Sequence, residues 1–320
     1  MFNPSINILL ASFNGEEFIA AQLDSILKQT YANWQLYIRD DGSSDNTIGI
    51  IKLYEQKDAR VHLVNVDSEN VGSCQNFSML MNCIKNENEY TMFCDQDDVW
   101  LPSKIESTLR EISLLEKRYS KDTPLLVHTN FLYVDSSLKT IESKKDFQPT
   151  KIKNPILANV LCQNSVYGCT MMINRKLAAI AGKIPTEAEN HDYWFALVAS
   201  AFGKIYYLNE RTILYRQHGN NASTQFDFNS LSKRFKRIAV DKKNFDDVKS
   251  KIIMALVFKK FYYNQLSVSN KKMVDDFLQL SKKRTPSLLF RNIKNGIRRQ
   301  TRSQTFLFYL TLLLSKRISA

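Results

Sequence analysis

Two periodicities of apolar side chains alternate along the first hundred residues, and this alternation constrains the fold more than any other feature of the sequence. Four short apolar runs have the length and composition of buried strands: residues 6–11, 34–39, 61–66 and 90–94. The segments between them space their apolar residues as helices do: residues 18–27, 48–54 and 77–84. Strands that alternate with helices imply right-handed crossovers. The pattern therefore predicts an α/β fold, with a mostly parallel sheet covered by helices on both faces.

The remainder of the chain changes character at about residue 225. Strand-like runs within 125–173 would extend the sheet, a helix is expected at 190–203, and two short strands are expected within 204–215. The last part of the chain combines helical spacing with dense Lys and Arg. We therefore expect a sheet-containing domain at 1–224 and a basic helical region at 225–320.

Charge is distributed unevenly between these regions. The whole chain has a formal net charge of +12, but residues 231–320 carry 22 basic and 5 acidic side chains, so their net charge is +17. Basic clusters interleaved with apolar residues are typical of amphipathic helices that lie on an anionic membrane, and we predict peripheral contact of this kind. The main alternative is a helical bundle that packs on the first domain with solvated charges. Nucleic-acid binding is not expected, because no recognised reading module accompanies the charge.

Several classes of protein are excluded by simple counts. The five cysteines form no CxxC pair and no Cys/His cluster with zinc spacing, so neither a disulfide framework nor a structural zinc site is expected. A reducing cytosol fits this cysteine usage best. The longest apolar stretch, residues 306–314, is about half as long as a helix that crosses a bilayer. The N-terminal segment lacks the basic region of a signal peptide, so none is expected.

In a sheet of this kind the ligand site lies at the carboxyl ends of the strands, where loops converge and helix N-termini point. The loops after the four predicted strands read SFNGEE, DDGSSDN, DSENVGS and DQDDVW. Three of these loops are rich in Asp, Asn, Ser and Gly. We therefore expect the binding residues there.

The DQDDVW loop places Asp95, Asp97 and Asp98 within four residues at a strand end. Carboxylates crowded in this way repel one another unless a cation, a basic residue or protonation relieves the repulsion. Aspartates at i and i+2 can give oxygens to one Mg²⁺ or Mn²⁺ and leave coordination positions for substrate phosphates. The alternative is a solvated acidic turn in which Asp98 caps the next helix. The position at the expected ligand edge favours the metal.

The first two loops indicate a nucleotide. Residues 12–16 could supply backbone N–H groups to a phosphate or a ribose, and Asn14 is a good N-cap for the helix that follows. Asp40, at a strand end that faces the crevice, could accept the ring N–H of a pyrimidine. A turn followed by a helix cap explains Gly42 and Ser43 without any ligand.

Two later segments carry further candidates. Asp192, in HDYW, precedes an apolar helix and is either a general base or a carboxylate stabilised by the helix dipole. In LYRQHGNN, Arg216 could bind a pyrophosphate and His218 could be a metal or phosphate ligand. Taken alone, each of these residues more often has a structural role.

Taken together and in order, these motifs resemble those of family 2 glycosyltransferases. The segment NILLASFNGEEFIAAQLDSILKQTYANWQLYIRDDGSSDNT, followed about 50 residues later by FCDQDDVWLPSKIE, resembles the first half of that family. The later motifs HDYW and ILYRQHGNN resemble the second half of the family. The resemblance covers roughly residues 5–222, about two thirds of the chain. The DQDDVW form is most similar to bacterial rhamnosyltransferases and related surface-polysaccharide enzymes.

The resemblance implies a GT-A fold and an inverting, metal-dependent glycosyltransferase. The donor would be a nucleotide-diphosphate sugar, with dTDP-rhamnose favoured and a UDP-hexose next. The acceptor would be a saccharide, lipid-linked, in bacterial cell-surface polysaccharide synthesis. Such an enzyme would be cytoplasmic, at the inner face of the plasma membrane.

The resemblance also implies roles for individual residues. Those that bind the nucleotide sugar would be Ser12, Asn14, Glu16, Asp40, Asp95 and Arg216. Those that bind Mg²⁺ or Mn²⁺ would be Asp95, Asp97 and His218. Asp192 would deprotonate the acceptor hydroxyl. One small departure is Cys94, which stands where Ser is common before the acidic motif.

Two other classes of protein were weighed. A nicotinamide- or methyl-donor-binding Rossmann enzyme would need a GxGxxG turn after the first strand, and SFNGEE has a single Gly. A non-catalytic nucleotide-sugar-binding or scaffold protein of a polysaccharide assembly complex would keep the fold and lose the metal ligands. Asp95, Asp97 and Asp192 are all present, which favours the enzyme.

Overall fold

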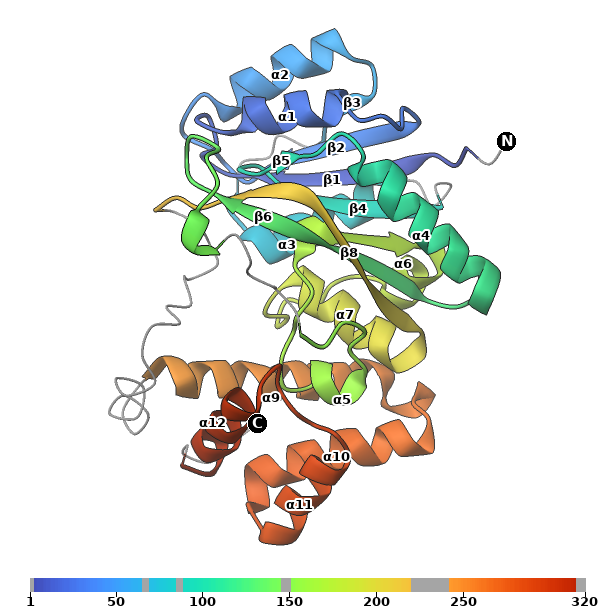
Figure 1. Cartoon of the computed structure of the whole chain (residues 1–320), viewed down its shortest axis with the longest axis vertical. Helices are drawn as coiled ribbons and strands as arrows, with labels where there is room; N and C mark the ends of the chain where they lie inside the picture. The colour runs from blue at the N-terminus through green and yellow to red at the C-terminus, as the bar shows by residue number, and fades with distance from the viewer. Residues whose placement is uncertain (1–2, 65–68, 85–88, 145–150, 220–241, 315–320) are drawn as a thin grey trace.

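The computed structural model describes residues 3–64, 69–84, 89–144, 151–219 and 242–314. Its centre is an eight-stranded sheet with the order β3-β2-β1-β4-β7-β6-β8-β5 (Figure 1). The strands are β1 (Ile6–Ser12), β2 (Trp34–Asp40), β3 (Val61–Leu63), β4 (Tyr90–Asp95), β5 (Val99–Trp100), β6 (Leu125–Val134), β7 (Met171–Asn174) and β8 (Lys204–Arg216). The longer helices are α1 (Ile19–Leu27), α2 (Thr47–Lys57), α3 (Ser73–Cys83), α4 (Lys104–Tyr119), α6 (Arg175–Ala181), α7 (His191–Phe202), α9 (Lys242–Tyr262), α10 (Val268–Lys283), α11 (Pro286–Lys294) and α12 (Arg302–Leu314).

The first four strands form the parallel half of the sheet, in which β1 lies between β2 and β4. Successive side chains of β1 enter opposite cores: Ile8 and Leu10 pack on one face, and Leu9 packs on the other. Burial on both faces explains why these strands read as continuous apolar runs. The strands predicted at 6–11, 34–39 and 90–94 are confirmed. The third is shorter than predicted, and part of its range lies outside the described residues.

The second half of the sheet is mixed. Strand β7 is antiparallel to both β4 and β6, whereas β8 is parallel to β6 and antiparallel to β5. The two short strands predicted at 204–207 and 212–215 are one strand, β8, because register shifts against β6 absorb the polar residues between them. Of the strand-like runs expected within 125–173, the first forms β6, and only the last residues of the later one enter the sheet, as β7. The α/β class with helices on both faces is confirmed, and the antiparallel strands make the sheet less uniformly parallel than the first hundred residues suggest.

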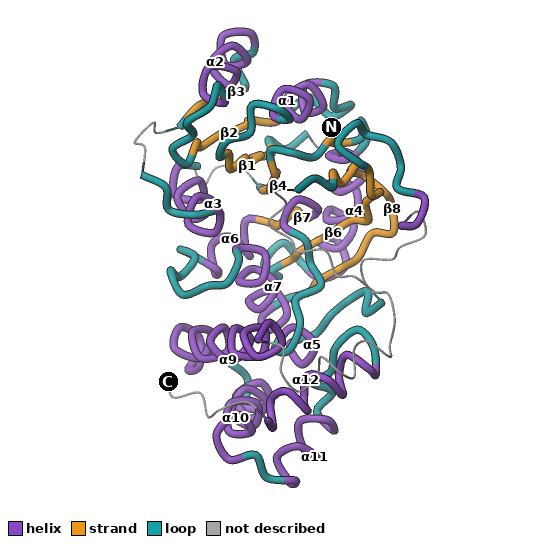
Figure 2. The backbone as a smooth tube through the Cα atoms, turned by 90° about the vertical axis from the view of Figure 1, so that its left-hand side faces the viewer, coloured by secondary structure: helices purple, strands orange, loops and turns teal. Residues whose placement is uncertain are grey.

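Helices cover both faces of the sheet (Figure 2). On one face, Ile19 of α1, Ile51 of α2 and Ile105 of α4 belong to a single apolar core. On the other face, Phe77 of α3 and Trp194 of α7 belong to a second core. A sheet covered on both faces leaves its strand ends as the places where polar loops gather.

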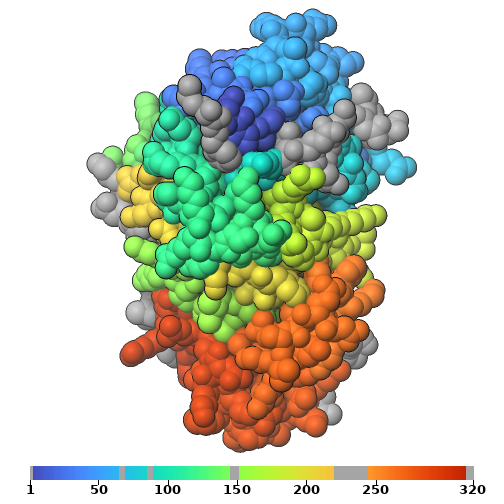
Figure 3. Space-filling view, turned by 90° about the vertical axis from the view of Figure 1, so that its right-hand side faces the viewer, coloured from blue at the N-terminus to red at the C-terminus, as the bar shows by residue number. Residues whose placement is uncertain are grey.

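The C-terminal helices pack on the sheet-containing part of the chain. Trp194 of α7 lies with its ring centroid 5.6 Å from that of Tyr262 in α9, and Lys251 of α9 makes an ion pair of 2.7 Å with Glu189. The core on this face continues through α10 and α12. The orange surface of the C-terminal helices meets the yellow surface of the sheet domain directly (Figure 3). The described part of the basic region therefore packs on the sheet-containing part of the chain. Membrane contact stays a prediction.

The boundary predicted at 224/225 falls within residues 220–241, outside the described part of the chain. Among the described residues, no helix combines the length and the hydropathy that a bilayer span requires.

Candidate active site

The carboxyl ends of β1, β2 and β4 meet at one edge of the sheet. In the strand register, Ser12 pairs with Asp40 and Ala11 pairs with Asp95. The start of α7 reaches the same edge, because Asp192 accepts a hydrogen bond of 3.1 Å from the Gly168 N–H and the sulfur of the next residue, Cys169, lies within 4.8 Å of an Asp95 oxygen. Residues that are 180 positions apart in the printed sequence therefore contribute to one site.

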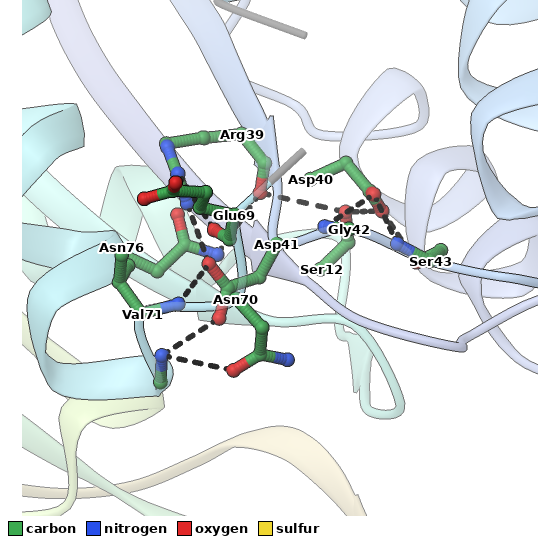
Figure 4. Close-up of polar contacts among 11 residues, drawn as sticks. Ser12, Arg39, Asp40, Asp41, Gly42, Ser43, Glu69, Asn70, Val71 and Asn76 are labelled. Atoms are coloured by element: carbon green, nitrogen blue, oxygen red, sulfur yellow. Dashed lines mark hydrogen bonds and ion pairs between the residues drawn. The ribbon is translucent and has the colours of Figure 1, made fainter. Parts of the chain in front are cut away.

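Asp40 is buried and its carboxylate is fully engaged within its own loop (Figure 4). Its Oδ1 accepts hydrogen bonds from the hydroxyls of Ser12 (3.0 Å) and Ser43 (2.6 Å). Its Oδ2 accepts hydrogen bonds from the backbone N–H groups of Gly42 (3.1 Å) and Ser43 (2.7 Å). These four bonds fix the turn after β2 and tie it to the end of β1.

Asp41, the next residue, ties the same turn to the loop before α3 (Figure 4). Its Oδ1 accepts from the Arg39 guanidinium at 2.7 Å, in an ion pair that is almost wholly buried. Its carboxylate also accepts from the backbone N–H groups of Val71 (3.0 Å) and Gly72 (2.8 Å). Sequence reasoning gave Asp41 no role. The available signal was the cation two residues earlier on the same strand.

Asn14 and Glu16 are exposed and join the first loop to the second. The Asn14 side chain accepts a hydrogen bond from the Ser44 backbone N–H at 2.8 Å, and Glu16 accepts one from the Asn46 N–H at 2.8 Å. The side chain of Gln96 makes two hydrogen bonds of 2.8 Å to the backbone of Phe13: it accepts from the N–H and donates to the carbonyl. These bonds connect the acidic loop to the first loop.

The helix cap predicted at Asn14 is wrong. Helix α1 begins only at Ile19 and has no side-chain cap, while Asn14 adopts a left-handed backbone conformation with φ of 46°. Asn tolerates this conformation better than most residues, because its short amide can bond locally. The residue that looks like a cap for its own helix thus supports the loop that leads into α2.

Two of the three aspartates of the acidic loop, Asp97 and Asp98, contact the end of β8 and the residues that follow it. Asp97 accepts from His218 Nε2 at 2.8 Å, and its backbone carbonyl accepts from Arg216 Nε at 2.7 Å. Asp98 Oδ1 accepts from the Arg216 backbone N–H at 3.1 Å. The predicted residues Asp97, Arg216 and His218 are thus brought together, although the last two lie more than 100 positions away in the sequence. Asp95 joins them through Asp98, because oxygens of the two carboxylates lie within 4.8 Å of each other.

Burial makes negative charge unfavourable at this cluster. It raises the pKa of Asp95 to about 7, with a further contribution from the charges of Asp97 and Asp192. It also raises the pKa of Asp98 well above its usual range. Asp98 Oδ2 has no hydrogen-bond partner among the described residues. A buried carboxylate oxygen without a donor is costly, so the cluster is arranged for a group that supplies positive charge.

These residues fit a divalent cation. Oxygen ligands of Asp95 and Asp98 and the Cys169 sulfur all lie within 4.8 Å of one another. Burial raises the pKa of the Cys169 thiol well above its usual range, so the thiol stays protonated and is a poor ligand. The remaining donors are carboxylate oxygens, which suit Mg²⁺ or Mn²⁺. Sequence reasoning missed Cys169, which comes from the segment before β7.

Asp192 lies in the first turn of α7 and has one free acceptor. Its Oδ2 accepts from the Gly168 backbone N–H at 3.1 Å, whereas its Oδ1 has no partner among the described residues. Burial raises the pKa of Asp192 to about 7, and the charge of Glu189 adds to the rise. The side chain can therefore accept a proton near neutral pH.

The residue before it, His191, packs its ring against Phe77 and Phe93 at centroid distances of 4.0 and 5.2 Å. A Cβ at Gly168 would lie 2.4 Å from His191 Nε2, so only glycine fits there. The start of α7 is thereby held in place from both sides.

Lys104, at the start of α4, is a buried cation behind the acidic loop. Its Nζ lies 4.7 Å from the centre of the Trp100 ring and has no hydrogen-bond partner among the described residues. Burial lowers its pKa to about 8, while nearby acidic groups, Asp98 among them, oppose the shift. Its sequence neighbours gave no sign of this burial.

The chain belongs to glycosyl transferase family 2, whose family model matches residues 7–175. An uncharacterized glycosyltransferase of Haemophilus influenzae is 25% identical over 250 residues, 73% of this chain and 72% of the relative. The Escherichia coli enzyme WfgD, a UDP-Glc:alpha-D-GlcNAc-diphosphoundecaprenol beta-1,3-glucosyltransferase, is 30% identical over 174 residues, 54% of this chain and 61% of the relative. The dTDP-rhamnosyl transferase RfbG of Shigella flexneri is 26% identical over 295 residues, 87% of this chain and 96% of the relative. The match thus spans about two thirds of the first two relatives and nearly all of RfbG.

Solved structures show the same fold. S. aureus TarS 1–349 in complex with UDP has a TM-score of 0.55 at 14% identity, with 90% of this chain and 75% of that chain covered. The mannosyltransferase PcManGT from Pyrobaculum calidifontis, in complex with GDP-Man and Mn²⁺, has a TM-score of 0.54 at 12% identity, with 98% and 86% covered. The predicted GT-A fold and the predicted enzyme class, a glycosyltransferase, are confirmed.

Proposed function

We propose that this protein is an inverting, metal-dependent glycosyltransferase of bacterial cell-surface polysaccharide synthesis, which moves a sugar from a nucleotide-diphosphate donor to a saccharide acceptor. The observation that carries the proposal is the juxtaposition at one sheet edge of two kinds of carboxylate. The aspartates at the end of β4 form a buried cluster of carboxylates whose oxygens converge, and Asp192 offers beside them an oxygen without a partner among the described residues. An inverting transfer needs both a stabiliser for the leaving diphosphate and a separate base.

Asp95 and Asp98, whose oxygens lie within 4.8 Å of each other, would hold Mg²⁺ or Mn²⁺ together with Asp97, and His218 would orient Asp97 through their 2.8 Å contact. When bound, such an ion stabilises the negative charge that develops on the leaving diphosphate. Arg216, whose guanidinium is bonded to the same loop, adds positive charge beside that position.

Asp192 would act as the base. Its Oδ1 accepts the proton of the acceptor hydroxyl while the hydroxyl oxygen forms a bond to the anomeric carbon of the donor sugar. The bond from that carbon to the diphosphate oxygen breaks, and the electron pair leaves with the diphosphate. The hydrogen bond from the Gly168 N–H to Oδ2 keeps Oδ1 turned toward the acceptor. Attack from the face opposite the leaving group inverts the anomeric configuration.

The first two loops would bind the nucleotide. Ser12, Asn14 and Glu16 shape this pocket through their contacts to the second loop. Asp40 was expected to contact the base. Its four hydrogen bonds within the loop support a narrower part in the proposal, which is to hold the backbone that faces the base.

We favour dTDP-rhamnose as the donor and a UDP-hexose next. RfbG, a dTDP-rhamnosyl transferase, matches this chain over nearly its whole length, which supports the first. WfgD uses UDP-Glc, and TarS is seen with UDP, which support the second. WfgD also acts on a diphosphoundecaprenol-linked acceptor, and this supports a lipid-linked acceptor here.

A lipid-linked acceptor would place the enzyme at the inner face of the plasma membrane. The net charge of +17 on residues 231–320 supports contact between the C-terminal region and an anionic membrane surface.

The test is calorimetric titration of the full chain with dTDP-rhamnose, UDP-glucose and UDP-N-acetylglucosamine, each with and without Mg²⁺ or Mn²⁺. We expect one donor to bind and its binding to depend on the ion. NMR of the product then gives the anomeric configuration. The proposal fails if no nucleotide sugar binds, or if the product retains the donor configuration.

A further inference from the structure

A cleft with a volume of about 910 Å³ lies among the C-terminal helices, far along the chain from the acidic loop. Its walls come from α11, α12, the segment between them and the segment before α5 (Leu157–Val160). Among the described residues, none of the side chains that line it is an aspartate or a glutamate. The described lining consists mainly of apolar and basic residues.

Three large apolar side chains of the lining are exposed to solvent. Ile156, Ile293 and Phe306 are 60%, 55% and 61% exposed, and they come from three different segments. Apolar surface left in water costs roughly 25 cal/mol per Å². A concentration of such side chains at one concave place marks a binding surface for an apolar group.

Five basic residues belong to the same lining: Lys151, Lys294, Arg298, Arg299 and Arg302. Arg299 is occupied, because it pairs with Asp247 at 2.5 Å and donates to the Cys162 carbonyl at 3.1 Å. The other four are exposed, and none has an ion-pair partner within the part of the chain that the structure describes. Four unneutralised cations beside an apolar wall complement an anion that is attached to a hydrocarbon chain.

We propose that this cleft binds an anionic phospholipid of the membrane surface. The acyl chain lies against the apolar wall, and the phosphate lies among the four cations. Peptides and nucleotides fit less well, because neither combines an anionic head with a long apolar tail. The inference rests on the membrane contact proposed above, and it replaces a diffuse charge attraction by a defined, saturable site.

The proposal can be tested on the full chain with a soluble lipid. The probe is dihexanoylphosphatidylglycerol below its micellar concentration, titrated by calorimetry, with dihexanoylphosphatidylcholine as the lipid without net charge. We expect one saturable site for the anionic lipid. The Lys294→Gln/Arg298→Gln variant should bind it about thirtyfold more weakly, which corresponds to about 1 kcal/mol for each basic side chain at an anionic surface.

Two matched controls separate the cleft from general charge and apolarity. Lys282→Gln/Lys283→Gln removes the same charge from the exposed last turn of α10, outside the lining, and should leave binding within twofold of wild type. Phe306→Ser should weaken binding at least fivefold, whereas Val268→Ser, at a more exposed apolar residue outside the cleft, should not. Thermal unfolding of each variant verifies that the fold is kept.

Three results would overturn the proposal. The first is the absence of saturable binding, and the second is an equal loss of affinity in Lys294→Gln/Arg298→Gln and in Lys282→Gln/Lys283→Gln. The third is saturation by farnesyl diphosphate but not by the phospholipid, which would make the cleft a site for a prenyl diphosphate. Donor titration on the same samples keeps this test separate from the proposed activity. A protein that binds phosphatidylglycerol and no nucleotide sugar would refute the activity and leave the lipid site standing.

Discussion

The assignment of Asp192 as the base can be tested by the variant Asp192→Asn. Asparagine has nearly the same size and can still accept the hydrogen bond from the Gly168 N–H, which is 3.1 Å long in the structure. It cannot accept the proton of an acceptor hydroxyl. Because a positioned general base contributes about 10²- to 10⁴-fold to a rate, we expect kcat to fall by about that factor. Donor affinity should stay within about threefold of wild type, since Asp192 takes no part in holding the diphosphate.

The pH dependence of the wild-type rate gives a second readout of the same residue. Burial raises the pKa of Asp192 to about 7, and the active form is the deprotonated one. The rate should therefore be level above pH 7 and fall about tenfold per unit below it. This acid limb should be absent from the residual rate of Asp192→Asn.

Glu189→Gln is the matched control for both readouts, because it removes one carboxylate three residues away. The charge of Glu189 raises the pKa of Asp192, and Lys251, its partner at 2.7 Å, lowers it. Loss of Glu189 should thus move the acid limb to lower pH and leave the plateau rate unchanged. The assay is release of nucleoside diphosphate with a saturating donor. An Asp192→Asn rate within threefold of wild type, or an unchanged acid limb in that variant, would refute the reasoning.

Three further predictions concern the same edge of the sheet. Asp97→Asn should abolish the ion-dependent part of donor binding, whereas Asp192→Asn should not. Calorimetric titration of the donor with and without Mg²⁺ distinguishes the two variants. Equal ion dependence in wild type and Asp97→Asn would contradict the metal role. Asp40→Asn should lower the free energy of unfolding by about 1–3 kcal/mol, because the buried turn loses acceptors for its hydrogen bonds. Denaturant unfolding measures this loss. A loss below about 0.5 kcal/mol would show that the turn does not depend on this carboxylate. Gly168→Ala should lower both the melting temperature and kcat, since its Cβ would lie 2.4 Å from His191 Nε2, and normal values of both would show that the start of α7 can adjust.

Much of the fold follows from local pattern, for a physical reason. Strands β1, β2 and β4 are buried on both faces, so their sequences carry uninterrupted apolar runs that nothing else in the chain imitates. Strand β8 was predicted as two pieces because its central residues are polar and partly exposed. Such a strand continues only because β6 pairs with it along its length.

The site residues were predictable where they lie close together in one loop, as Asp95 and Asp97 do. They were not predictable where a contact joins segments that are distant in the sequence. Asn14 is a residue type that often caps helices, and only the fold shows that its side chain accepts a hydrogen bond from the Ser44 backbone N–H instead. Cys169 was set aside because its sequence neighbours carry no ligands, yet the antiparallel strand β7 brings it beside the acidic loop.

Helix α7 begins at the proposed base, and its other side faces the C-terminal helices. Trp194, two residues after Asp192, packs on α9, so the element that aims the base is also the element that anchors the basic region. The two parts of the chain therefore cannot be exchanged as independent modules between related enzymes. A chimera that joins this sheet domain to the C-terminal helices of another enzyme would need a surface that fits Trp194. Without such a surface, α7 and the proposed base would be misplaced, and turnover would fall whether or not the protein contacts a membrane.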